Sequence, residues 1–332
     1  MVSQNHLDAI REIIDSSHQV LITTHVNPDG DAIGSEMALA RYLGQIGKSV
    51  KIINSSPTPS GMRFLDPRNA IEVFDEDRHI EDVTAADAVF ILDISDWARL
   101  QDLGKLLKKM HYPRVCIDHH PAQNKFVDID AIYPKASSTG ELIYDCLKAW
   151  GAKLNMRICE AMYTAVMTDT GGFRFSNTSP RVHEIAADFL RYKVSPNNVY
   201  AELYENQPIE RVKLMGEVAG TIETSADGRA GWVYVTQDML RKTGATLKDT
   251  DGFSDLPRTI EGIEVALFFA ELEDPKVKVS FRSKGRVVIN EVARKFDGGG
   301  HKFAAGATIK GKLPDVMESV IREITNLLNP AG

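Results

Sequence analysis

Val20-Leu-Ile-Thr-Thr-His-Val-Asn-Pro-Asp-Gly-Asp-Ala-Ile-Gly34 is the stretch that decides the fold. Its first five residues form a β-rich run that predicts a buried parallel strand, and residues 32–45 carry apolar side chains at helical spacing. Open α/β sheets bind ligands beyond the carboxyl ends of their strands, so the loop between these elements is a candidate metal site. Alternatively, it is an ordinary turn in which Asp31 caps the helix. Three side chains in the loop could bind cations: His25, Asp29 and Asp31.

Composition is typical of a globular protein. The chain has 332 residues, of which 43% are hydrophobic and 26% charged, and this length favours two domains. A net charge of −7 excludes general attraction to long duplex nucleic acid. Residues 1–17 form an amphipathic helix pattern rather than a signal peptide, and no apolar run has membrane-spanning length. Three unpaired cysteines also favour a reducing compartment, so we expect a cytoplasmic protein with no membrane partner.

Two further apolar strands end on metal-binding residue types. Residues 88–92 end on Asp93, which could instead cap the next helix, although Ser95 or Asp96 could do so. Residues 114–117 run directly into Asp118, His119 and His120. Adjacent residues on an extended backbone point to opposite sides, so we expect the two histidines to have different roles. Asp118 is suited to orienting an imidazole by a hydrogen bond.

Two helices follow in the amino-terminal half. Residues 136–141 resemble a capping box, so the main interpretation is that they begin a helix. A lesser interpretation is that one of their hydroxyl groups reaches the candidate metal site. A helix over residues 157–168 delivers Asp169 at its carboxyl end. The helix dipole disfavours a carboxylate there, which indicates a compensating cation. His183 is interpreted as a packed or surface residue.

The chain becomes polar and proline-interrupted over residues 192–221, which we interpret as a helical linker. It separates a domain of residues 1–191 from one of residues 222–332. The second domain is predicted to contain strands 231–236, 263–269 and 276–281 and helices 287–296 and 313–328. Two features of this domain could hold an anion: two polar residues at the end of a strand, and consecutive glycines followed by a histidine. These residues are Arg282, Ser283, Gly299, Gly300 and His301. Alternatively, Gly298 could be only a helix cap.

The order of these motifs resembles the DHH phosphoesterase superfamily with its DHH-associated carboxyl-terminal domain. The motifs are His25-x-Asn-Pro-Asp-Gly-Asp31, Asp93, Asp118-His-His120, Thr168-Asp-Thr-Gly171 and Gly298-Gly-Gly-His301. The short two-domain layout looks like the stand-alone nano-RNase and pAp-phosphatase type. This resemblance implies an α/β fold with an amino-terminal parallel-sheet domain, a smaller carboxyl-terminal α/β domain and an active site in the cleft between them.

The resemblance also implies a site for two Mn²⁺ ions, with other divalent cations possible. By motif position, His25 and Asp29 would bind one ion, whereas Asp31, His119 and Asp169 would bind the other. Asp93 would bridge both ions. His120 would face the scissile phosphate with support from Asp118. The nucleotide would be held by Arg282, Ser283, Gly299, Gly300 and His301.

The implied activity is hydrolysis of short oligoribonucleotides to mononucleotides and dephosphorylation of 3′-phosphoadenosine 5′-phosphate (pAp). Two alternatives stay open. One is a phosphodiesterase for pApA or c-di-AMP, which would share every metal ligand. The other is a nucleotide-binding regulatory protein that does not turn its ligand over. We expect a short RNA or small nucleotide as the substrate, and apolar segments of the linker could support a homodimer.

Overall fold

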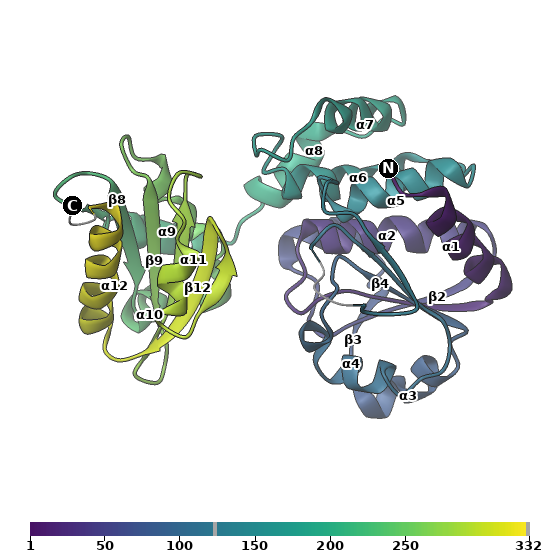
Figure 1. The fold of residues 1–332 in the computed structure, drawn as a ribbon, viewed down its shortest axis with the longest axis horizontal. Coiled ribbons are helices and arrows are strands. Elements are labelled where there is room, and N and C mark those ends of the chain that lie inside the picture. The colour runs from purple at the N-terminus through teal and green to yellow at the C-terminus, as the bar shows by residue number, and fades with distance from the viewer. Residues whose placement is uncertain (122–124, 330–332) are drawn as a thin grey trace. The chain divides into compact units, whose positions relative to one another are not determined.

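The computed structural model describes residues 1–121 and 125–329. The chain divides into two compact units, Met1–Asn206 and Gln207–Gly332 (Figure 1). Each unit contains its own six-stranded sheet. Within the described residues, no helix combines the length and the apolar character needed to cross a membrane.

The sheet of the first unit is entirely parallel. Its strands lie in the order β3 (Ile71–Val73), β2 (Ser49–Asn54), β1 (Gln19–Thr23), β4 (Ala88–Leu92), β5 (Arg114–Asp118) and β6 (Ile129–Ile132). This is the order of a doubly wound fold, in which the direction of winding reverses between β1 and β4. The reversal opens a crevice beyond the carboxyl ends of these two strands, which is where ligands of such sheets bind.

Alternating side chains of each strand enter cores on opposite faces of this sheet. Val20 and Ile22 pack with α1 (Gln4–Ser16), α2 (Gly30–Gln45), α5 (Thr139–Ala149), α6 (Met156–Asp169) and α7 (Pro180–Arg191). Leu21 packs on the other face with α3 (Glu76–Thr84) and α4 (Gln101–Leu107). In Figure 1, α2 runs along the sheet, between the strands and the pair α5 and α6. The apolar strand pattern therefore reflects burial on both faces, as expected for parallel strands.

Residues 192–221 are divided between the two units. They form α8 (Pro196–Tyr200), a π-helical turn η3 (Ala201–Glu205) and α9 (Ile209–Ala219). Val199 and Leu203 are buried in the first unit's core, whereas Leu214 and Val218 are buried in that of the second. Short 3₁₀ helices elsewhere are η1 (Ser60–Leu65), η2 (Trp97–Leu100), η4 (Leu247–Thr250), η5 (Phe253–Asp255) and η6 (Pro257–Thr259).

The sheet of the second unit is mixed. Its strands lie in the order β11 (Gly299–His301), β12 (Ala304–Lys310), β10 (Lys276–Ser283), β9 (Val265–Glu271), β8 (Ala230–Val235) and β7 (Glu223–Thr224). Only the β8–β9 pair is parallel among the pairs described. Helices α11 (Asn290–Arg294) and α12 (Leu313–Leu328) contribute to one core, and α9 and α10 (Gln237–Thr243) contribute to the other. The helix predicted over 287–296 is shorter, because residues 285–287 form a bend in which Gly285 has a φ of +95°.

Candidate metal centre

The candidate ligands of the first unit lie at the crevice between β1 and β4. His25 follows β1, Asp93 follows β4, and both side chains are almost fully buried. Asp93 has a φ of +59°, a left-handed conformation that is uncommon for a residue other than glycine. Such conformations persist where the surrounding structure holds them and concentrate at functional sites.

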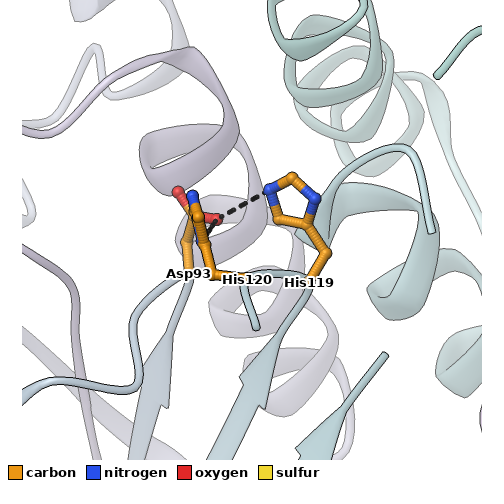
Figure 2. Close-up of side chains that lie close together, drawn as sticks. All are labelled: Asp93, His119 and His120. Atoms are coloured by element: carbon orange, nitrogen blue, oxygen red, sulfur yellow. Dashed lines mark ion pairs between the residues drawn. The ribbon is translucent and has the colours of Figure 1, made fainter. Parts of the chain in front are cut away.

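Three groups of side chains have ligand atoms within 4.8 Å of one another. The groups are His25 with Asp29 and Asp93, then Asp31 with His119 and Asp169, and then Asp93 with His119 and His120. Asp93 and His119 each belong to two groups, so the groups form one continuous cluster. Figure 2 shows both histidines directed toward Asp93 above the ends of adjacent strands. All six metal ligands predicted from the sequence are thus brought together.

His119 lies at the middle of this cluster. Its Nε2 atom is 3.6 Å from a carboxylate oxygen of each of Asp31, Asp93 and Asp169. The same atom is buried and forms no hydrogen bond with any described residue. Burial lowers the pKa of His119 to about 4, so the imidazole is neutral at pH 7. A neutral imidazole nitrogen surrounded by carboxylate oxygens has the donor chemistry of a divalent metal site.

The buried carboxylates are costly in the absence of a cation. Burial and the neighbouring carboxylates raise the pKa values of Asp31 and Asp93 well above their usual range. Burial, with a smaller contribution from Asp29, raises the pKa of Asp169 to about 7. A bound divalent cation would remove this penalty, because it replaces repulsion between like charges with attraction. The charge distribution therefore fits a metal centre.

The start of helix α5 supports two of these carboxylates. The hydroxyl group of Thr139 donates to Oδ1 of Asp93 at 2.9 Å. The backbone N–H groups of Thr139 and Gly140 donate to Asp31 at 2.7 and 2.8 Å. Ser138 caps the helix by accepting a hydrogen bond from the N–H of Glu141. Both interpretations of this segment therefore apply, since it begins a helix and also places a hydroxyl group in the site.

Two capping interpretations are settled by the structure. Helix α2 is capped by Asp29, whose carboxylate accepts hydrogen bonds from the N–H groups of Asp31 and Ala32. The alternative in which Asp31 is the cap is therefore wrong. Asp96 caps η2, which leaves the carboxylate of Asp93 in the cluster. Asp29 combines its capping role with membership of a candidate metal group, since a carboxylate has two oxygens.

The two adjacent histidines lie side by side. Their ring centroids are 4.5 Å apart, so the expectation that they point to opposite sides is wrong. The reason is that β5 ends at Asp118 and the following residues do not continue the extended strand. Oδ1 of Asp118 lies 2.8 Å from Nδ1 of His120 and also accepts a hydrogen bond from the His120 N–H. This contact raises the pKa of His120, whereas that of His119 is lowered.

Close packing of α2 on α6 places Asp31 beside Asp169. A Cβ atom at Gly34 would lie 2.4 Å from the carbonyl oxygen of Ala161, and one at Gly30 would lie 2.5 Å from the Thr168 side chain. Only glycine allows this approach of the two helices.

A buried network behind the cluster was not predicted from the sequence. Glu36 is fully buried and accepts a hydrogen bond at 2.9 Å from the side-chain amide of Asn54. The carbonyl oxygen of that amide accepts from the N–H of Thr24, the residue before His25. The only signal in the sequence is a glutamate within the apolar periodicity of residues 32–45.

Two of the predicted substrate residues of the second unit lie on strands that flank β12 on either side. Arg282 on β10 and His301 on β11 are both paired with Ala304 on β12. Residues directly opposite one another across a sheet project to the same face, so the guanidinium and imidazole groups share one face of this sheet. Ser283 is buried, and its hydroxyl oxygen accepts hydrogen bonds from the following turn.

The glycine run of this unit has a packing role. Gly298 and Gly300 lie against the backbone of β12, where a Cβ atom would approach a carbonyl oxygen to 2.3 and 2.5 Å, respectively. Gly300 also has a φ of +137°. Gly299 has open space at its Cβ position.

Comparison with known proteins decides the family. Residues 19–167 match the N-terminal domain of the DHH family, and residues 232–329 match the DHHA1 domain. The chain is 33% identical over 317 residues to the "Bifunctional oligoribonuclease and PAP phosphatase NrnA" of Thermus thermophilus, covering 94% of this chain and 91% of the relative. The chain belongs to the DHH family.

Other DHH-family relatives agree over most of the chain. The Bacillus subtilis protein of the same name is 32% identical over 299 residues, which cover 87% of this chain and 89% of that protein. A crystal structure of an exopolyphosphatase-related protein from Bacteroides fragilis superposes with a TM-score of 0.92 at 27% identity, covering 99% of this chain and 98% of the other. Five of the six candidate ligands lie within the matched DHH range, and Asp169 lies just beyond it.

Proposed function

We propose that this DHH-family protein is a metal-dependent phosphoesterase that hydrolyses short oligoribonucleotides to mononucleotides and dephosphorylates pAp. The observation that carries the proposal is the convergence of carboxylates and imidazoles into three overlapping groups, two of which share Asp93 and two of which share His119. The names of the relatives from Thermus thermophilus and Bacillus subtilis support the choice of substrate.

The proposed cofactor is a pair of Mn²⁺ ions, which other divalent cations could replace. His25 and Asp29 would hold one ion, whereas Asp31, His119 and Asp169 would hold the other, with Asp93 shared. Mixed carboxylate and imidazole donors suit such a metal better than one that selects thiolates. Bound cations would lower the pKa of water in the site and neutralise the negative charge that develops on the phosphoryl group.

His120 is proposed to contact the phosphoryl group. The hydrogen bond that His120 donates to the Asp118 carboxylate favours the protonated imidazole, since it raises the pKa of His120. No described residue forms a hydrogen bond with Nε2 of His120, which leaves this atom able to donate to a phosphoryl oxygen. A cationic donor of this kind stabilises the added negative charge of the transition state. Asp118 acts as a positioning residue.

The second unit is proposed to bind the remainder of the nucleotide. Arg282 and His301 would contact phosphate oxygens from their shared face of the sheet, and Gly299 and Gly300 would offer backbone N–H groups. Ser283 would hold the turn that follows Arg282. The proposed domains are residues 1–191 and 222–332, joined by residues 192–221.

A substrate panel tests the function. We would measure kcat/KM with Mn²⁺ on a dinucleotide RNA, a five-nucleotide RNA, pAp, pApA and c-di-AMP, using Asp93→Ala as the inactive control. The proposal expects the short RNAs and pAp to be the best substrates. A preference for pApA or c-di-AMP would favour the dinucleotide phosphodiesterase. Nucleotide binding without release of phosphate or mononucleotide would contradict an enzyme and favour the regulatory protein.

A homodimer and a cytoplasmic location complete the proposal. Each unit has exposed apolar side chains close in sequence to the boundary, as is typical of surfaces that a partner covers. Tyr200 and Tyr204 of the first unit are 48% and 46% exposed, and Ile209 and Val212 of the second are 58% and 48% exposed. Light scattering of the purified protein would show a mass near twice 36.8 kDa if the dimer forms. All three cysteines are free and buried, which agrees with a reducing compartment.

A further inference from the structure

A pocket lies in the first unit, outside the candidate metal centre. It has a volume of about 670 Å³ and is lined by the last turns of α2, strand β2, residues 66–70 and the start of α6. None of its lining residues belongs to a candidate metal group. Arg41 follows Asp31 by ten residues on α2, which corresponds to about 15 Å along the helix axis.

The pocket is lined by an excess of positive charge. Arg41, Arg68 and Arg157 line it, and Asp66 is the carboxylate among the lining residues. Asp66 is buried, and its two oxygens accept hydrogen bonds from the N–H groups of Ala70 and Ile71 at 2.9 Å. The carboxylate therefore anchors the loop rather than pairing with an arginine, and the three cations retain a net attraction for an anion.

The three guanidinium groups differ in how firmly they are held. Arg41 is fixed by hydrogen bonds to the backbone carbonyl oxygens of Leu65 and Arg157. Arg68 and Arg157 are exposed, and neither side chain forms an ion pair or hydrogen bond with a residue that the structure describes. Half-buried Glu160 is near Arg41 and Arg157, although no ion pair forms. Arg41 therefore provides a fixed positive charge, and Arg68 and Arg157 can move to bind a phosphate group through bidentate hydrogen bonds.

The first turn of α6 adds to this attraction. Asn155 caps the helix, which runs for 14 residues from Met156, and Asn155 lines the pocket with Arg157. The amino end of a helix carries partial positive charge and therefore favours an anion.

The floor of the pocket is apolar. Met37 and Ile52 are buried, and Val50, Pro67 and Ala70 complete this surface. A phosphate ion alone would leave it uncovered, whereas a planar ring attached to the phosphate would cover it. The volume lies in the range of about 300–1,000 Å³ that is usual for small-molecule sites.

We propose that this pocket binds a small phosphorylated ligand with a planar apolar body, of the nucleoside monophosphate class. The arginines and the start of α6 bind the phosphate, and the apolar floor contacts the base. The site is separate from the candidate metal centre, and α2 connects the two because it carries Asp31 at its start and Arg41 near its end. The proposal does not depend on the proposed catalytic function.

Photolabelling with 8-azido-AMP tests the proposal on the full chain. Labelled peptides are identified by mass spectrometry in the parent and in a double variant, Arg68→Glu with Arg157→Glu. Lys109→Glu is the control for a charge reversal outside the pocket, because Lys109 is an exposed cation on the surface beyond α4; it makes one such reversal where the double variant makes two. AMP and inorganic phosphate are added as competitors. Turnover of pAp is measured separately, so that failure of the catalytic proposal is seen independently.

The expected result is saturable labelling of peptides that contain residues 37–70 or 155–160. AMP should compete at least tenfold better than phosphate. The double variant should lose this labelling by tenfold or more while turning over pAp at the parent rate, and Lys109→Glu should retain both. Labelling that is absent from these peptides, or unchanged by the charge reversals, would overturn the site. Equal competition by phosphate would overturn the nucleotide class of the ligand.

Discussion

The Nε2 atom of His25 lies 3.4 Å from Oδ2 of Asp93, although the two residues follow different strands of the sheet. Strands β1 and β4 are neighbours in the sheet, and the strand order reverses between them. The same arrangement brings Asp29 into this group and places His119, which follows β5, beside the other carboxylate oxygen of Asp93. The topology of the sheet thus determines the cluster.

Replacement of Asp93 should affect both proposed cations. We expect Asp93→Ala to lower kcat by at least about a thousandfold, because a shared ligand is lost and the remaining donors are no longer held together. The assay is release of mononucleotide from a short RNA with Mn²⁺. Asp96→Ala is the control, since it removes a nearby carboxylate that caps η2. Parent-like turnover by Asp93→Ala would contradict the metal assignment.

Thr139 tests the support around Asp93. Thr139→Val removes the hydrogen bond to Asp93 and preserves the backbone contacts to Asp31. We expect Mn²⁺ affinity to fall by about 10- to 100-fold, as is usual when a group that orients a ligand is lost. Isothermal titration calorimetry measures this change. Thr139→Ser retains the hydroxyl group and should bind like the parent; equal losses in both variants would indicate a packing effect instead.

Metal binding should release protons at low pH. The pKa of Asp169 is raised to about 7 without metal, mainly by burial, so this carboxyl is largely protonated at pH 6 and ionised at pH 8. A cation must displace that proton, and apparent Mn²⁺ affinity should therefore rise with pH up to about 7. Titrations in buffers of different ionisation enthalpy count the protons. If no more protons are released at pH 6 than at pH 8, this electrostatic account fails.

Glu36 should become destabilising as the pH rises. Burial raises its pKa from 4.5 to about 8, so its contribution to stability is complete below pH 4.5 and is lost as the pH rises to 8. Glu36→Gln keeps an acceptor for Asn54 without the titration. The free energy of unfolding of this variant relative to the parent should increase by up to about 1.4 kcal/mol per pH unit between pH 5 and 8.

Chemical denaturation at pH 5.5, 7 and 9 measures that difference. Glu36→Leu, which removes the acceptor, should be less stable than Glu36→Gln at each pH. A difference between the Gln variant and the parent that does not vary with pH would show that Glu36 is not buried in the neutral form.

Much of the first unit could be predicted because its strands have a clear sequence pattern. Continuous apolar runs stop abruptly at His25, Asp93 and Asp118, and buried parallel strands must end where charged residues begin. Strand β6 was missed, since Asp130 interrupts its apolar pattern and the carboxylate is used to bond the N–H groups of Phe126 and Val127.

Other features depend on contacts between distant residues. The contact of the Thr139 hydroxyl group with Asp93 requires α5 to start beside β4, which no local pattern specifies. Strands β11 and β12 were also missed, because the consecutive glycines from Gly298 to Gly300 indicate a loop. In the structure, Gly298 and Gly300 instead allow the backbone of this segment to pack closely against β12.

The most direct test of the metal centre is anomalous diffraction from crystals soaked in Mn²⁺. We predict two manganese peaks, one contacted by His25, Asp29 and Asp93 and the other by Asp31, Asp93, His119 and Asp169. A map without manganese at these side chains would contradict the account.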